Sequence, residues 1–436
     1  MMKQAICMVI MCASLAAQAP AQVEAQSNNQ APFTITLQDA IARAKHLAPD
    51  FHAVLTDYGI AKEDRVQSRA ALLPSANYNM QFVYTQPLPG NVPRFIANNG
   101  AHEYIAQGNA HQSLSMTDLG NYRRSVALQE VARAKAEIAA RGLLVTVVQS
   151  YYGFVVAQRK YSTSQQAATE AQRFLDLSRK LENGGEVAHA DVIKAQLQFN
   201  DKQRDLRESQ LGMERSRVSL ALLLFPDFNQ NFSVIDDLRL PDAPPPFEEV
   251  RRLAQVKNPD LAVALAAVHA GGSEVLAARG GYLPAVTFDY WYGIDANHLA
   301  TKTDGISNLG YSAAATLNLP IWNWGATHSK VKQGILRRDQ AKLELTFAQK
   351  KLLGQLKTLY QETEASAAEL DLLRQSAQLA ADSLRLTTLR YQGGEATVLE
   401  VVDAQNTLAL ARNAYDDSEV RYRAALANLQ TLTGIL

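Results

Sequence analysis

The side chains of this chain that could do chemistry lack the spacing that catalysis or metal binding needs. The eight histidines form no His-x-x-x-His pair, and His102 and His111 fall in a segment that we expect to be a loop. No nucleophile elbow, P-loop or Gly-x-Gly-x-x-Gly motif occurs. Both cysteines, Cys7 and Cys12, lie near the start. We therefore expect no enzyme activity, no metal site and no cofactor.

A pair of acidic residues could act on ions instead. Glu400 and Asp403 lie three residues apart, shortly after Gly393-Gly394 and near an expected helix start. Three residues are close to one helical turn, so the two carboxylates would share one face. Acids are favoured at helix N-termini in any case, so on the residues alone this pair is an ordinary solvated helix start. Three copies around an axis would instead bring six carboxylates together.

The elements that position these acids occur twice in the chain. Gly393-Gly394-Glu395 has an earlier copy, Gly184-Gly185-Glu186, 209 positions before it. Behind each copy, large and small residues alternate on a 3-4 spacing, which is typical of a coiled-coil seam. The large positions are Val401, Leu408, Tyr415, Tyr422 and Leu429 in one copy and Val192, Phe199, Leu206, Met213 and Leu220 in the other. This pattern indicates an internal duplication. We expect a signal peptide at 1–25, repeats at 26–239 and 248–436, and a proline-rich linker at 240–247.

Composition narrows the class of protein. Lys3 precedes an apolar stretch, which predicts a cleaved secretory signal containing both cysteines and therefore a mature chain without disulfides. Basic and acidic residues both number 43, which argues against nucleic-acid binding. No later run of 18 or more apolar residues occurs, so we expect no membrane-spanning helix. The short alternating strands of a membrane β-barrel remain possible.

Each half predicts the same order: a helix, two amphipathic strands, a very long helix, a tight turn and a returning helix. The expected strands are 76–84, a weaker one at 113–117, 286–292 and 311–319. The long helices, about 121–183 and 325–392, would each reach roughly 90 to 100 Å. Four strands cannot close a barrel, and open edges cannot face lipid. We therefore expect three copies to combine into a barrel of about twelve strands.

Several motifs together resemble a known family over nearly everything after the signal. They are Leu37-Gln38-Asp39-Ala40 with Pro49, a Leu-Pro pair before each first strand, Trp324-Gly325, and Arg390-Tyr391-Gln392-Gly393-Gly394 with Val401 to Gln405. This set is similar to the outer-membrane efflux (TolC-like) family. The resemblance implies a mainly α homotrimer, with a β-barrel in outer-membrane lipid continued by an α-helical tunnel across the periplasm. It also implies a passive export duct, opened by a periplasmic adaptor (membrane fusion) protein and an inner-membrane transporter.

The same resemblance implies roles for particular residues near the two glycine turns. Glu400, Asp403 and Asp191 match the acids that ring the periplasmic end of the tunnel, and Tyr391 matches the tyrosine of the gate. The family's turn arginine is Ala396 here, and Lys194 is a candidate substitute. The turn glycines, Gly184, Gly185, Gly393 and Gly394, are most often just C-caps that allow a left-handed backbone, and adaptor contact at them is an added inference. The alternative is a soluble periplasmic coiled-coil scaffold or adaptor, for which the paired amphipathic strands would have no use.

Overall fold

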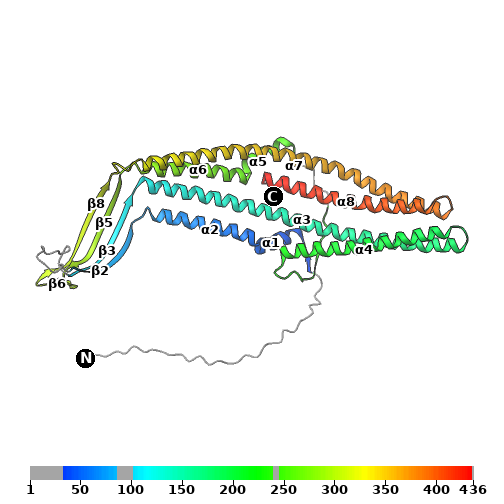
Figure 1. Cartoon of the computed structure of the whole chain (residues 1–436), viewed down its shortest axis with the longest axis horizontal. Coiled ribbons are helices and arrows are strands. Elements are labelled where there is room, and N and C mark those ends of the chain that lie inside the picture. The colour runs from blue at the N-terminus through cyan, green and yellow to red at the C-terminus, as the bar shows by residue number, and fades with distance from the viewer. Residues whose placement is uncertain (1–32, 86–101, 239–244, 435–436) are drawn as a thin grey trace, which may run out of the picture.

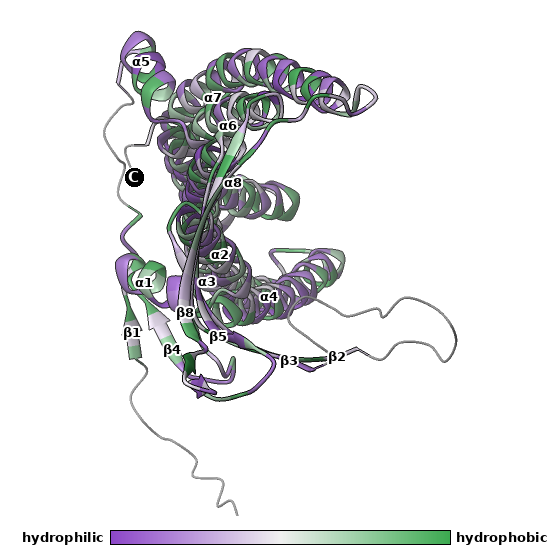
Figure 2. Cartoon of the chain, turned by 90° about the vertical axis from the view of Figure 1, so that its left-hand side faces the viewer, coloured by the Kyte–Doolittle hydropathy of each residue, from purple (hydrophilic) through white to green (hydrophobic). Residues whose placement is uncertain are grey.

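The computed structural model describes residues 33–85, 102–238 and 245–434, so the expected signal peptide and most of the expected linker lie outside the described residues. The chain is elongated, with a sheet at one end and two helical hairpins reaching the other (Figure 1). Viewed along the long axis, the helices stand side by side in one curved wall (Figure 2). Of the two long helices, α3 (Met116–Asn183) contacts helices on both of its sides, whereas α7 (Ala326–Gln392) lies at one edge of the wall (Figure 1).

The order of elements runs twice through the chain. The first half contains β1 (Phe33–Ile35), α1 (Leu37–Leu47), α2 (Pro49–Ala70), β2 (Ser75–Tyr84), β3 (His102–Leu114), α3 (Met116–Asn183), α4 (His189–Leu224) and β4 (Phe232–Val234). The second contains α5 (Phe247–Lys257), α6 (Pro259–Gly280), β5 (Ala285–Ala296), β6 (Lys302–Thr303), β7 (Ile306–Ser307), β8 (Leu309–Asn318), α7 (Ala326–Gln392) and α8 (Val398–Thr433). The repeat boundaries themselves remain a prediction.

Proline divides the first helix of each half into two. Ala48 and Asn258 have extended backbones, and the following Pro49 and Pro259 begin new helices. Proline suits this first helical position because its missing N–H would have no intrahelical partner there. The second helix of each half then runs beside the long helix of its own half.

The large sheet is antiparallel in the order β2-β3-β5-β8. Its register and the alternation of side chains separate an apolar face from a polar one. The apolar face carries Tyr78, Met80, Phe82, Tyr84, Tyr104, Phe288, Tyr290, Tyr292, Tyr311 and Leu317. The polar face carries Asn77, Asn79, Gln81, Gln107, Asn109, His111, Asp289, Trp291, Asp295 and Ser312. β2 and β8 are edge strands, so the sheet stays open in one protomer, as expected for a barrel shared among copies.

Strand β3 differs from the prediction. The expected strand at 113–117 is mostly wrong, because β3 ends at Leu114 and Ser115 caps α3 by accepting a hydrogen bond from the Asp118 N–H at 3.0 Å. His102 and His111 lie in β3 and not in a loop. The alternation is hidden in β3 because Ala106, Gly108 and Ala110 supply its apolar face with small residues.

Two helical segments meet a length and hydropathy criterion for crossing a membrane, Met116–Asn183 and Phe247–Gly280. The expectation of no candidate helix was therefore too simple. The apolar character of α6 has a packing explanation: a Cβ on Gly280 would lie 2.5 Å from the Thr117 nitrogen, and one on Gly271 would lie 3.0 Å from the Arg338 Cα. Small residues let α6 approach α3 on one side and α7 on the other.

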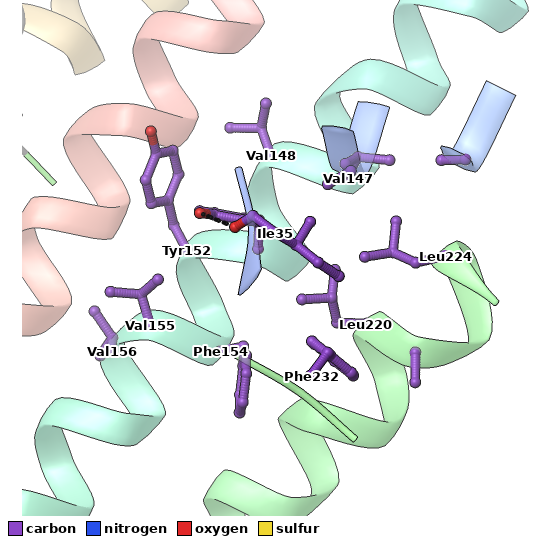
Figure 3. Packing of buried hydrophobic residues seen from close by; sticks show 14 of the residues in the cluster. Ile35, Val147, Val148, Tyr152, Phe154, Val155, Val156, Leu220, Leu224 and Phe232 are labelled. Atoms are coloured by element: carbon purple, nitrogen blue, oxygen red, sulfur yellow. Dashed lines mark hydrogen bonds between the residues drawn. The ribbon is translucent and has the colours of Figure 1, made fainter. Parts of the chain in front are cut away.

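The largest core lies halfway along the helices, where α1, β1 and β4 pack on α3 and α4. Figure 3 shows Ile35 of β1 among Val147 and Val148 of α3 and Leu220 and Leu224 of α4. The buried Tyr151 hydroxyl lies 3.1 Å from the Ile35 carbonyl oxygen and 2.8 Å from the Ile235 carbonyl oxygen, and it can donate its one proton to either. This core anchors the hairpins, whose tips project from it.

Candidate pore entrance at the hairpin tips

The two glycine turns lie at the same end of the molecule, opposite the sheet (Figure 1). Gly185 and Gly394 adopt left-handed φ angles of 75° and 74°, which explains the requirement for glycine at these positions. In each turn, a backbone N–H closes back on the helix that has just ended. Glu186 donates to the Leu181 carbonyl at 2.9 Å, and Glu395 donates to the Arg390 carbonyl at 2.8 Å. The predicted adaptor-contact turns are thus two matching Schellman-type caps.

Glu400 has a structural role besides its charge. It forms a capping box with Thr397: the Thr397 N–H donates to Glu400 Oε1 at 3.1 Å, and the Glu400 N–H donates to Thr397 Oγ1 at 3.4 Å. The Thr397 backbone and side-chain hydrogen bonds, with a smaller contribution from Arg390, lower the pKa of Glu400. Its carboxylate is therefore held ionised at the start of α8.

Arg390 is a charged residue of this region whose contacts were not predicted from the sequence. Its guanidinium lies 3.4 Å from Glu400 Oε2 and donates to the Glu395 carbonyl at 3.1 Å. Arg390 therefore joins the end of α7, the turn and the start of α8. Its place in the motif with Tyr391 was visible, but a contact ten residues away depends on the turn geometry.

The remaining predicted acids lie at the starts of the returning helices. Asp403 is exposed on α8. Asp191 is partly exposed on α4 and lies 3.9 Å from Lys194 in the same helix. Gln198 Nε2 of α4 donates to Asn406 Oδ1 of α8 at 3.1 Å, so the two helices meet about two turns from Asp191. Lys194 thus pairs locally, whereas Arg390 is the basic partner of Glu400.

Tyr391 links the two hairpins. Its ring is buried 5.1 Å from the Phe174 ring, and its hydroxyl lies 3.3 Å from the Ser178 hydroxyl. Both partners belong to α3, whereas Tyr391 ends α7. The apolar cluster around them also includes Leu175, Val192, Ala195, Val398 and Val401. Separating the hairpin tips would have to break this contact.

A groove of about 690 Å³ lies beside this contact, between α3, α7 and α8. Apolar side chains such as Phe174, Leu384 and Leu408 line it. Its charged lining residues are Glu170, Arg173, Arg385 and Arg412. Among residues 33–85, 102–238 and 245–434, no group of three or more His, Cys, Asp or Glu side chains is arranged to hold a metal ion.

Comparisons with known proteins agree with this architecture. Residues 250–435 match the family model "Outer membrane efflux protein". The chain is 23% identical over 422 residues to the alkaline protease secretion protein AprF of Pseudomonas aeruginosa, covering 93% of this chain and 85% of that protein. It is 21% identical over 413 residues to the outer membrane protein TolC of Escherichia coli, covering 92% and 82%.

Solved structures show the same fold. The MtrE outer membrane channel of Neisseria gonorrhoeae superposes with a TM-score of 0.77 at 18% identity, covering 91% of this chain and 88% of that one. The CmeC outer membrane channel of Campylobacter jejuni gives the same TM-score, 0.77, at 18% identity, with 91% and 85% covered. The second half of the chain therefore matches the outer membrane efflux protein family, and the whole chain has the fold of these outer membrane channels.

Proposed function

We propose that three copies of this chain form an export channel, with the sheets closed into one barrel in the outer membrane and the helices forming a tunnel in the periplasm. The observation that carries this proposal is the two-faced sheet with free edges at β2 and β8. An apolar outer face fits lipid, and a polar inner face fits a water-filled lumen. Pairing β2 of one copy with β8 of the next would satisfy both edges.

The polar face of the sheet suits a conduit for solutes. Strands β2, β3, β5 and β8 contain Glu103, Asp289 and Asp295 but no lysine or arginine. His111 Nδ1 lies 2.7 Å from Asp289 Oδ1 on this face. The duct acts passively and not as an enzyme, in keeping with relatives that are channels.

We further propose that the hairpin tips form the gate. Glu400, Asp403 and Asp191 would ring the entrance, and Tyr391 would hold α7 against α3 while it is closed. The turns at Gly184-Gly185 and Gly393-Gly394 are exposed at the far end, where a periplasmic adaptor coupled to an inner-membrane transporter would reach them. The relatives' names mention alkaline protease secretion and pyoverdine export, so no single class of cargo follows.

The channel proposal is tested by reconstituting the full chain. We expect a detergent-stable trimer that inserts into planar bilayers and gives stepwise currents. The two variants are Ala313→Pro and Ala314→Pro in the edge strand β8. Neighbouring residues of a strand point their N–H groups to opposite sides, so only one of the two prolines removes a hydrogen bond to the next copy. That variant should lose both trimer and current. A soluble monomer without current from the unmodified chain would refute the proposal.

The alternative, a soluble periplasmic scaffold, predicts a different behaviour of the sheet. Tyr78, Met80 and Tyr311 are at least 70% exposed on the apolar face of one protomer. A soluble scaffold would have to cover this face with its own chain, and none of the described residues does so. We therefore favour the channel.

A further inference from the structure

The proposed channel leaves open how the barrel is held at its depth in the membrane. The relevant surface lies where the sheet meets the helices. β2 and β5 start at this level and β3 and β8 end at it, so the antiparallel order brings four strand–helix junctions to one end of the sheet. We call the exposed residues of these junctions the collar.

Large apolar side chains are exposed at all four junctions. They are Leu73, Leu114, Tyr282, Leu283, Leu319, Ile321, Trp322 and Trp324. Trp322 and Trp324 are 74% and 89% exposed, and their rings meet edge to face at 5.6 Å. Apolar residues of this size continue the apolar face of the sheet towards the periplasm. Indole and phenol rings favour the level of the lipid headgroups.

The tryptophan turn is held in a fixed shape. Trp324 and Gly325 have consecutive left-handed φ angles of 54° and 81°, which is rare for a residue as bulky as tryptophan. The Ala326 N–H donates to the Asn323 carbonyl at 3.0 Å, and the Ser329 N–H donates to the Gly325 carbonyl at 2.9 Å. A turn that keeps a strained tryptophan in an exposed position points to a role for the ring outside the protomer.

Basic side chains lie within about two helical turns of the same junctions. Arg69 ends α2, Arg279 ends α6, Arg123 is in the start of α3, and Lys330 and Lys332 are in the start of α7. All five are exposed, and they take part in none of the ion pairs found among the described residues. Two of the nearby carboxylates are already used: Asp118 accepts a hydrogen bond from the Ser115 hydroxyl, and Glu274 pairs with Arg124 and Arg337. The five cations therefore exceed the two exposed carboxylates near the end of α2, Glu63 and Asp64.

We propose that the collar binds anionic phospholipid headgroups of the inner leaflet, with the tryptophan pair seated among the headgroups and the five cations on the phosphates beside them. The proposal rests on the barrel placement above. It is continuous with the lipid-facing side of the sheet, and the unpaired positive charge matches a phosphate layer. Each protomer of a trimer would contribute the same set, which makes the contact a ring.

The chain contains three tryptophans, Trp291, Trp322 and Trp324, and Trp291 lies on the polar face of the sheet. In a Trp291→Phe variant, fluorescence therefore reports the collar alone. Trimers of this variant should be placed in phosphatidylcholine vesicles that contain brominated phosphatidylglycerol or brominated phosphatidylcholine at equal fractions. We expect both lipids to quench the fluorescence, bromine near the headgroup more than bromine near the chain end, and phosphatidylglycerol more strongly by about twofold.

The charge dependence is tested by changing Arg69, Arg279, Lys330 and Lys332 together to glutamine. This variant should keep the quenching by phosphatidylcholine and lose the preference for phosphatidylglycerol. The control changes four exposed cations far from the sheet, Arg207, Lys350, Lys351 and Lys357, to glutamine and should keep the preference.

The outcomes separate this proposal from the channel proposal. Trimers that conduct but show no quenching would place the tryptophans against a neighbouring protomer and overturn the lipid contact alone. Equal quenching by the two lipids would overturn the anionic preference. Vesicles without trimers or currents would overturn the channel proposal and the collar with it.

Discussion

The hydroxyl of Tyr391 on α7 lies 3.3 Å from the hydroxyl of Ser178 on α3, and both side chains are buried. We expect Tyr391→Phe to keep the packing on Phe174 and to lose only this hydrogen bond, worth about 1 kcal/mol. The closed state should therefore weaken, and single-channel recordings should show more frequent openings. Ser178→Ala should have the same effect, and the double variant no more than either alone. Independent, additive effects would contradict a shared contact.

The acids at the tips should control ion selection. Replacing Glu400 with Gln and Asp403 with Asn removes two charges per protomer, and glutamine can keep the capping box with Thr397. Reversal potentials should show a weaker cation preference, and block by polyvalent cations from the periplasmic side should mostly disappear. Asp201→Asn with Glu208→Gln, two exposed acids of α4, is the charge-matched control. Unchanged selectivity in the double variant would mean that these acids are ordinary solvated residues at a helix start and do not select ions.

A buried acid on α8 should make stability depend on pH. Burial raises the pKa of Asp416 to about 6, although Arg159 nearby opposes the shift. A raised pKa means that the ionised form is disfavoured in the fold, so Asp416 costs stability above about pH 6 and this cost is relieved as the pH falls towards 4. Asp416→Asn should therefore melt a few degrees above the parent at about pH 7.5, and the gap should close by about pH 4.5.

The control for Asp416 is its neighbour Asp417, which is largely exposed and pairs with Lys160 at 2.6 Å. Asp417→Asn should show no pH-dependent gap of this sign. Comparing each variant with the parent at the same pH removes the effect of groups such as Glu214, whose hydrogen bonds from Arg217 lower its pKa. A gap for Asp416→Asn that stays constant across this range would contradict the raised pKa.

Two glycines of α6 should respond oppositely to alanine. A Cβ on Gly280 would lie 2.5 Å from the Thr117 nitrogen of α3, whereas one on Gly272 meets nothing within 4 Å. Gly280→Ala should lower the free energy of unfolding by about 1–3 kcal/mol through overpacking. Gly272→Ala should raise it by about 0.5–1 kcal/mol through helix propensity. Thermal unfolding of the two trimers measures both, and equal melting temperatures would mean that α3 and α6 lie further apart.

Sequence periodicity was sufficient to predict the elements that keep one apolar face along their whole length. β2 and β8 alternate strictly, and the seams of α4 and α8 repeat every seven residues, so both were predictable. Tyr422 and Leu408 of the predicted seam are buried, whereas Tyr415 is only partly so because its hydroxyl reaches Glu419 at 3.0 Å. Most of β3 was not predicted, because the small residues on its apolar face differ too little in hydropathy from their polar neighbours to show an alternation.

Contacts between distant segments could not be predicted in the same way. The pairing of Tyr391 with Ser178 spans 213 residues and depends on how the two hairpins are placed side by side. Arg390 and Glu400 are close in sequence, but their ion pair exists because the Gly393-Gly394 turn reverses the chain. The cations of the collar are scattered in the sequence, and their proximity depends on the antiparallel sheet, which places the four strand–helix junctions at one end.

The free edges of the sheet have a consequence for inheritance. β2 and β8 each present ten residues, and both must pair with other copies before the barrel can close. One chain with a damaged β8 therefore spoils the barrel of two intact partners. In a cell that makes equal amounts of intact and damaged chains, random assembly would leave only about one trimer in eight fully intact. A mutation in β8 that still allows trimers to assemble should therefore be dominant, even though the other gene copy is normal.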